Sequence, residues 1–216
     1  MNPSPKTLVM SSKIHRKRAK AENEGEERGE GRVDDQTEKV FRLDAAFVKS
    51  QKRNYSKEIW EDKGEVKLPF KESFTKIIVD VEEELAKEIK QLNLNRNPVV
   101  TVKDAEKLSE VSWLVGQQCN LDFVPKWFEK LHSLETVDFR FNDIPEIPHW
   151  LLRMEDLEWL FLDNNAALQS IPTPEESLIR LDMPGCDIQK LPHNFFNSQL
   201  ISVDLSGNRG QSFVKI

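Results

Sequence analysis

The side chains that most often carry out catalysis are few in this sequence and widely spaced. Among the 216 residues, His132, His149 and His193 lie far apart along the chain. A nucleophile elbow, a phosphate-binding loop, a dinucleotide-binding fingerprint and a histidine cluster with metal-ligand spacing are all missing from the sequence. We therefore predict that the chain is not an enzyme and that it binds no metal and no cofactor.

A second set of side chains has the chemistry of a binding surface. Tryptophan and arginine are enriched in the hot spots of protein interfaces, and large aromatic side chains are costly to leave in water. The candidate partner-binding residues are Trp113, Asp138, Arg140, Trp159, Phe161, Asp163, Arg180 and Asp182. The alternative stays open that the aromatic rings only pack over one another or over Gly116.

The elements that must position these residues follow from a repeat in the sequence. Each copy has a leucine-like residue, a second one two positions later, and an Asn or Cys three positions beyond that. The six copies are Leu92-Leu94-Asn97, Leu114-Gly116-Cys119, Val137-Phe139-Asn142, Leu160-Leu162-Asn165, Leu181-Met183-Cys186 and Val203-Leu205-Asn208. Their first residues are successively 22, 23, 23, 21 and 22 positions apart, which predicts a stack of similar structural units.

Each copy is expected to contain a short strand. Because side chains alternate along a strand, the two leucine-like residues would enter the core, while the residue between them and its outer neighbours would point out. Stacked copies would pair these strands into a parallel sheet with neighbours about 4.8 Å apart. The eight candidate residues fall on the outward face of that sheet.

The third residue of each copy is predicted to bind backbone groups that are left unpaired where the strand ends. This structural ladder comprises Asn97, Cys119, Asn142, Asn165, Cys186 and Asn208. Cys119 and Cys186 are three copies apart, so their separation is roughly 14 Å, which is too far for a disulfide. We expect two buried, unreactive thiols.

A proline recurs after an apolar residue in four of the copies, at Pro125, Pro148, Pro172 and Pro192. Together with the repeat, this pattern resembles the leucine-rich-repeat family, and within it the intracellular class of 21 to 23-residue repeats with a Leu-Pro step. The resemblance covers roughly residues 85 to 213. It implies an α/β fold, a leucine-rich-repeat solenoid with short parallel strands on the concave face and helical turns or loops on the convex face. It also implies a protein-protein interaction module, whose partners in the family include signalling enzymes, phosphatases and small GTPases.

The segments before the repeats differ in composition. Residues 1–35 combine a basic cluster at 13–20 with a Glu/Gly-rich run, so we predict a disordered charged tail. Residues 36–72 are expected to form a partly helical linker, and residues 73–90 an amino-terminal capping helix. The repeats would then occupy residues 86–216 as about six copies, the last of them incomplete.

Charge and composition set the remaining expectations. A net charge of -6 argues against nucleic-acid binding over the whole surface, and no apolar run reaches the roughly 18 to 20 residues of a membrane span. The leading hypothesis is a scaffold, adaptor or regulatory subunit, in the cytoplasm or the nucleus, that binds a partner protein on the concave face. The alternative is a nuclear or nucleic-acid-associated factor that uses residues 13–20. We also expect that a dimer or a longer parent chain covers the open end of the last repeat.

Overall fold

The structure, a computed structural model, describes residues 38–69, 73–195 and 199–209. The chain divides into two compact units, Met1–Glu30 and Gly31–Ile216, and all described residues belong to the second. The predicted disordered tail, the basic segment 13–20 and the end of the last repeat therefore lie outside the described residues. No helix within the described ranges is long and apolar enough to cross a membrane.

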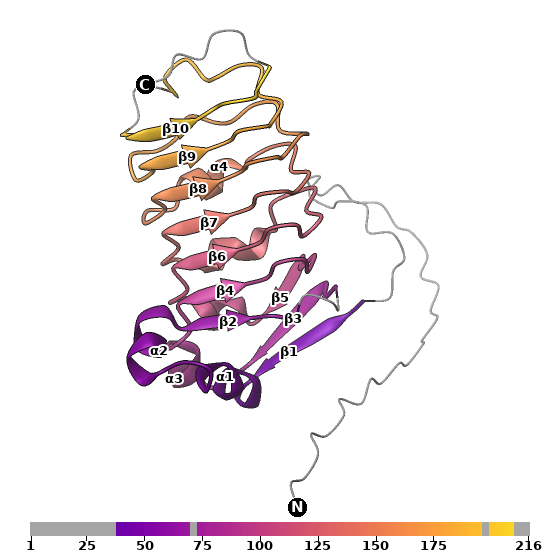
Figure 1. Cartoon of the computed structure of the whole chain (residues 1–216), viewed down its shortest axis with the longest axis vertical. Helices are drawn as coiled ribbons and strands as arrows, with labels where there is room; N and C mark the ends of the chain where they lie inside the picture. The colour runs from indigo at the N-terminus through magenta and orange to yellow at the C-terminus, as the bar shows by residue number, and fades with distance from the viewer. Residues whose placement is uncertain (1–37, 70–72, 196–198, 210–216) are drawn as a thin grey trace, which may run out of the picture. The chain divides into compact units, whose positions relative to one another are not determined.

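Seven short parallel strands form the main sheet, in the order β10-β9-β8-β7-β6-β4-β2 (Figure 1). They are β2 (Glu65–Lys67), β4 (Gln91–Asn93), β6 (Trp113–Val115), β7 (Thr136–Asp138), β8 (Trp159–Phe161), β9 (Arg180–Asp182) and β10 (Ser202–Asp204). The register places Leu92 opposite Leu114, and Leu114 opposite Val137. Residues one sequence repeat apart therefore stack as successive rungs, and the expected solenoid of the α/β class is confirmed. We call the outward side of this sheet the concave face.

The hydrophobic core follows the inner side of the main sheet. The first leucine-like residue of each repeat points into it, because alternate side chains of a strand face the same way. Leu114, Leu160 and Leu181 are fully buried. Val203 and Leu205 are only partly buried, because β10 is the terminal strand of the described sheet.

The side of the chain opposite the main sheet changes along the solenoid. In the N-terminal repeats a second parallel sheet has the order β1-β3-β5. Its strands are β1 (Val40–Asp44), β3 (Lys76–Asp80) and β5 (Thr101–Lys103). The short helix η1 (Ala105–Leu108) follows β5 in the same repeat, and the next two repeats carry η2 (Lys126–Lys130) and α4 (His149–Leu152). Pro125 and Pro148 directly precede η2 and α4, where the fixed φ of proline suits the start of a helical turn.

Three helices lie at the β2 end of the main sheet (Figure 1). They are α1 (Ala45–Lys52), α2 (Lys57–Lys63) and α3 (Glu83–Ala86). Asp44 caps α1 by accepting a hydrogen bond from the amide of Phe47 at 2.8 Å, and Ser56 caps α2 in the same way. Gly64 ends α2 with a φ of 45°, and a Cβ there would lie 2.2 Å from the carbonyl oxygen of Glu88. Only glycine fits this position without a shift of the backbone.

The predicted capping helix over residues 73–90 is wrong. That segment contains the strand β3 and the four-residue helix α3. Ile77 and Val79 are buried in alternation with more exposed neighbours, which is the pattern of a strand rather than of a helix. The helical cap comes from earlier in the chain, where residues 36–72 supply α1, α2 and the additional rung β2.

Candidate functional site

The concave face is built from three columns of outward side chains, with one residue of each column on every rung. Between β6 and β9 the first column contains Trp113, Thr136, Trp159 and Arg180; the second contains Val115, Asp138, Phe161 and Asp182; and the third contains Gln117, Arg140, Asp163 and Pro184. All eight predicted partner-binding residues lie in these columns, on four consecutive rungs. The register of the sheet thus brings together residues that are far apart in the sequence.

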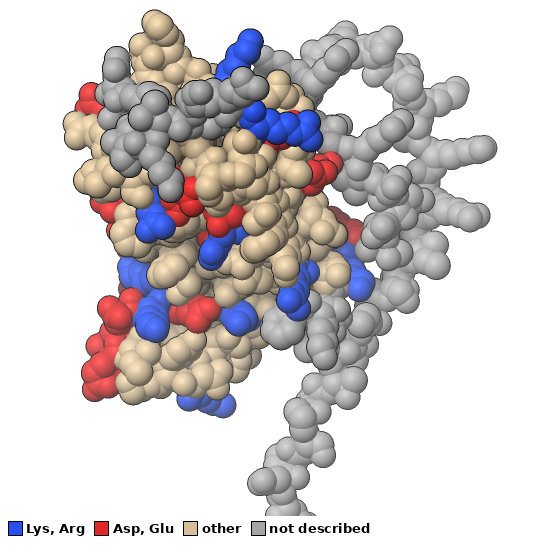
Figure 2. Space-filling model, turned by 45° about the horizontal axis from the view of Figure 1, so that its top comes forward, with Lys and Arg blue, Asp and Glu red and all other residues tan. Residues whose placement is uncertain are grey.

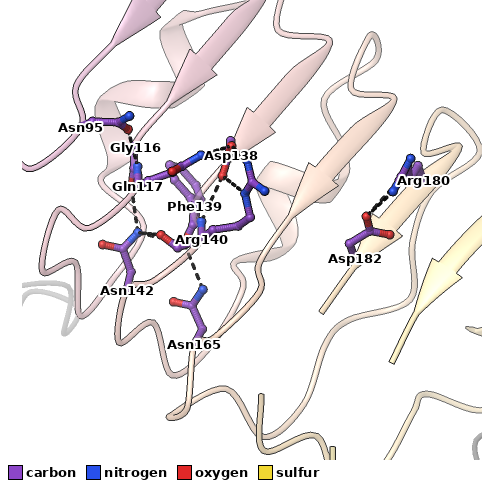
Figure 3. A network of polar contacts seen from close by, with 10 residues as sticks. All are labelled: Asn95, Gly116, Gln117, Asp138, Phe139, Arg140, Asn142, Asn165, Arg180 and Asp182. Carbon is purple, nitrogen blue, oxygen red and sulfur yellow. Dashed lines mark hydrogen bonds and ion pairs between the residues drawn. The ribbon is translucent and has the colours of Figure 1, made fainter. Parts of the chain in front are cut away.

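Asp138 on β7 is the most fully engaged carboxylate of this face. It is 4% exposed, and Arg140 donates to both of its oxygens, from Nε at 2.9 Å and from Nη2 at 2.7 Å (Figure 3). Gln117, on the preceding rung, donates from Nε2 to the Oδ2 atom at 2.6 Å. The hydrogen bonds with Asp138 are the main cause that raises the pKa of Arg140 above its ordinary value. A guanidinium held by two bonds in this way is fixed in orientation.

A second arginine-aspartate pair lies two rungs away on β9. Arg180 donates from Nε at 2.9 Å and from Nη2 at 2.7 Å to the same oxygen, Oδ2, of Asp182 (Figure 3). The ring of Phe161 lies on the rung between the two pairs, and its centroid is 5.7 Å from Cζ of Arg140 and 5.4 Å from Cζ of Arg180. Both distances are within the range of a cation-π contact. One ring and two ion pairs therefore form a single cluster across three strands.

Asp163, in the third column beside β8, has a less favourable environment. Burial is the main cause that raises the pKa of its carboxyl group above the ordinary value, and the charges of Asp182 and Asp138 raise it further. A backbone hydrogen bond and the charge of Arg140 oppose this rise. The Oδ1 atom of Asp163 is buried and has no hydrogen-bond partner among the described residues. This part of the face therefore holds a carboxylate that its surroundings do not fully stabilise.

Trp113 and Trp159 project into solvent from the first column. They are 45% and 44% exposed, and the small, buried Thr136 lies on the rung between them. Neither ring covers Gly116, because a Cβ on that glycine would lie 3.2 Å from the ring of Phe139. Phe139 thus fills the core space that Gly116 leaves, and both tryptophans are available at the surface.

The six ladder positions follow the ends of successive strands. Asn142 illustrates their bonding: its Oδ1 accepts hydrogen bonds from the amides of Cys119 at 2.9 Å and Leu121 at 3.1 Å. Its Nδ2 donates to the carbonyl oxygens of Gly116 and Phe139, each at 2.8 Å (Figure 3). The side chains of Asn97, Asn165 and Asn208 bond backbone groups in the same way. Each asparagine therefore joins its own turn to the preceding one.

Two features decide the architecture: parallel rungs that are one sequence repeat apart, and a column of asparagines that bond each turn to the preceding one. The chain has the leucine-rich-repeat fold. Two cysteines complete the ladder of this leucine-rich-repeat chain: Cys119 donates from Sγ to the carbonyl of Leu94 at 3.3 Å, and Cys186 donates to that of Leu162 at 3.2 Å. Both thiols are free and buried. Burial raises the pKa of Cys119 to about 11 and also raises that of Cys186, so both stay protonated at neutral pH.

Comparisons with known proteins give matches of structure only. No protein-family model matches the sequence, and no curated protein matches it. Similar solved structures include the functional domain of InlJ from Listeria monocytogenes, whose description notes a cysteine ladder (17% identity, 65% of this chain, TM-score 0.45). They also include a leucine-rich-repeat protein of Leptospira interrogans, with 22% identity over 73% of this chain and a TM-score of 0.48. A third is an internalin, InlF, of Listeria monocytogenes, with 12% identity over 64% of this chain and a TM-score of 0.37. The matched parts make up 36%, 47% and 50% of the three structures, respectively.

The sequence repeat did not single out one exposed aromatic residue at the end of the β7 rung. Phe141 directly precedes the ladder residue Asn142, is 49% exposed and has a φ of 60°. The equivalent residues of the other rungs also have positive φ, and they are Arg96, Gln118, Asn164, Gly185 and Gly207. All of these are polar or glycine. An aromatic residue in this column was thus the signal that could have identified Phe141.

The three histidines among the described residues take no part in the concave cluster. His132, His149 and His193 are all exposed. Within the described ranges, no group of three or more His, Cys, Asp or Glu side chains could hold a metal ion. What the concave face offers chemically is aromatic surface, fixed guanidinium groups and carboxylates, which are the components of a binding site.

Proposed function

We propose that the chain is a protein-binding module, acting as a scaffold, adaptor or regulatory subunit, and that its partner docks on the concave face. The observation that carries this proposal is the exposure of Trp113 and Trp159 on the same face. Two rungs separate their backbones by about 10 Å, and Thr136 between them leaves room for a partner side chain. Burying large rings of this kind is a principal source of affinity at protein interfaces.

The charges of the solenoid agree better with a protein partner than with a polyanion. On the side shown in Figure 2, acidic and basic side chains are interspersed among uncharged residues, without a broad basic surface. Arg140 and Arg180 on the concave face are each paired with an aspartate, so they do not form an unneutralised cationic patch. The same proposal places the chain in a reducing compartment, the cytoplasm or the nucleus, because both cysteines are free thiols.

Affinity capture with paired variants tests the proposal. The full chain and the variant Trp113→Ala plus Trp159→Ala would be used as baits in parallel, and captured proteins identified by mass spectrometry. We expect at least one specific partner to be lost from the variant. With that partner purified, its Kd should rise by more than about tenfold, the effect typical of losing one or two interface hot spots.

A matched control separates a specific loss from a general loss of exposed apolar surface. Ile59 on α2 is 46% exposed, away from the concave columns, so Ile59→Ala should retain every partner. Circular dichroism would verify that both variants keep the fold of the unmodified chain. If the double tryptophan variant retained all partners, concave-face binding would be wrong.

A further inference from the structure

The acidic side chains of the concave cluster outnumber its basic ones. Asp138, Asp163 and Asp182 face Arg140 and Arg180 on three consecutive rungs. Asp138 uses both of its oxygens, which accept from Arg140 and Gln117. The surplus negative charge therefore lies on the β8 and β9 rungs, at Asp163 and Asp182.

Two carboxylate oxygens at this place have no donor. Asp182 is 7% exposed, and both bonds from Arg180 go to its Oδ2 atom. Its Oδ1 atom and the Oδ1 atom of Asp163 are buried without a hydrogen-bond partner among the described residues. Buried polar atoms are rarely left in this state, because an unmade hydrogen bond costs free energy. Two such oxygens on adjacent rungs mark the part of the concave face where an added donor would gain most.

The missing donor is best matched by a cation. The raised pKa of Asp163 shows that its charged form is under-stabilised, chiefly by burial and also by Asp138 and Asp182. A positive group placed between Asp163 and Asp182 would offset both effects. The ring of Phe161 already lies beside two guanidinium groups, so an aromatic surface for a further cation is present.

We propose that Phe161, Asp163 and Asp182 form a binding site for an arginine side chain of a basic, extended segment of the protein partner. The proposal rests on the proposed function and deepens it. A guanidinium carries five donors in one plane, so it can bond two carboxylates on adjacent rungs while its flat face stacks on a ring; an ammonium group has three donors and no flat face to stack. Arg180 bonds only the Oδ2 atom of Asp182, so this ion pair can remain in place while the Oδ1 atom accepts from the incoming group.

Fluorescence anisotropy with labelled peptides tests the site on the full chain. The probes are the labelled peptide Arg-Ser-Arg-Ser-Arg-Ser and its counterparts in which lysine or glutamate replaces every arginine. We expect the arginine peptide to bind more tightly than the lysine peptide, and the glutamate peptide to show no binding. Asp163→Asn plus Asp182→Asn should weaken binding of the arginine peptide by about tenfold or more.

A charge-matched variant guards against unspecific attraction between a basic peptide and an acidic protein. Asp122 and Asp143 are exposed acids in the turns that follow β6 and β7, so Asp122→Asn plus Asp143→Asn changes the net charge by the same amount. This control should bind the arginine peptide within about twofold of the unmodified chain, because exposed charges away from the site are screened. Equal losses in the two double variants, or no loss in either, would overturn the arginine site.

Thermal unfolding supplies a readout that does not depend on the peptide. The concave variant removes the charge of Asp163, whose charged form is disfavoured by burial, and leaves an amide oxygen at position 182 to accept from Arg180. Its Tm should therefore equal or exceed that of the unmodified chain. A clearly lower Tm would mean that these carboxylates stabilise the fold, and would contradict the proposal. If the acidic variant kept the partner that Trp113→Ala plus Trp159→Ala releases, the arginine site would be wrong while concave-face binding would stand.

Discussion

Phe141 holds a backbone conformation that is unfavourable for its residue type. Its φ of 60° lies in the left-handed region, which costs a bulky L-residue about 1–2 kcal/mol. Three of the five equivalent turns are occupied by Asn164, Gly185 and Gly207, which tolerate that region; the other two are occupied by Arg96 and Gln118, which are polar and unbranched at Cβ. An exposed ring that is kept at a strained position fits a surface selected for binding rather than for stability.

Replacing the ring of Phe141 should increase the stability of the fold. Phe141→Asn is expected to raise the free energy of unfolding by about 1 kcal/mol, because asparagine adopts positive φ more readily. Urea denaturation followed by circular dichroism measures the change. The converse substitution, Asn164→Phe, should destabilise by a similar amount. A loss of stability in Phe141→Asn would mean that the ring packs against the solenoid and that strain does not dominate.

One carboxylate bonds both N-terminal helices, α1 and α2, to the start of the repeats. Glu88, shortly before β4, accepts a hydrogen bond from Nζ of Lys52 in α1 at 2.6 Å and another from the indole nitrogen of Trp60 in α2 at 2.8 Å. The bond from Lys52 is the main cause that lowers the pKa of Glu88 below its ordinary value of 4.5, with Trp60 contributing in the same direction. Part of the attachment of the cap thus depends on the ionised form of Glu88.

The stability of this attachment should fall in acid. Because the pKa of Glu88 is lower in the folded chain than in the unfolded one, its contribution is fully present above the unfolded value of 4.5. The contribution is lost as the pH falls through the folded value. Glu88→Gln should therefore lower the Tm at neutral pH, and its difference from the unmodified chain should vanish in acid.

The measurement is thermal unfolding from about pH 7 to about pH 3, the interval that includes the titration of carboxyl groups. Glu61, which forms an exposed pair with Lys57 at 3.7 Å on α2, provides the control substitution Glu61→Gln. This control should have little effect at any pH, since exposed pairs contribute little. A difference between Glu88→Gln and the unmodified chain that stayed constant with pH would show that the charge of Glu88 is not the cause.

The elements that the sequence could predict are those with a local, repeated pattern. The rungs from β4 to β10 each follow that pattern, and their register matches it. The N-terminal region is harder to predict because Ile77 and Ile78 fit a helical stripe as well as a strand. Their β-branched side chains favour the strand that forms. The rung β2 was missed because Val66 lies 26 positions before Leu92, outside the spacing of the other copies.

The concave site was predictable only as a set of outward positions. Alternation on a strand identifies the columns, but it does not specify which charged groups pair within them. Arg140 could have paired with Asp163 on the next rung as well as with Asp138 on its own. The structure selects Asp138, and that choice leaves Asp163 under-stabilised. Such choices depend on side-chain rotamers, which the sequence repeat does not encode.

At the scale of the whole solenoid, stability depends on contacts between neighbouring rungs. The hydrophobic core extends from Leu43 in β1 to Phe195 in the later repeats, so it has no single centre. A defect in a middle rung should therefore uncouple the parts on either side, whereas a defect at the end should remain local. The asparagine ladder allows the same chemical change to be made at both places.

Asn142→Ala removes a middle ladder residue, and it should destabilise the chain by about 3 kcal/mol. The reason is that it leaves the amides of Cys119 and Leu121 and the carbonyls of Gly116 and Phe139 without their side-chain partner. The denaturant dependence should also become shallower, because the two parts unfold separately. Urea unfolding measures both quantities, and amide hydrogen exchange should show faster exchange on both sides of this rung.

Asn208→Ala is the matched control at the terminal rung. Asn208 makes equivalent bonds, with the amide of Ile188 at 2.8 Å and with the carbonyls of Met183 at 2.7 Å and Leu205 at 2.9 Å, but it is only partly buried. Its loss should cost about 1 kcal/mol and accelerate exchange only around β10, since water can replace the lost partner there. Equal losses of stability, with one sharp transition in both variants, would show that the solenoid unfolds as a single unit and that rungs do not act through their neighbours alone.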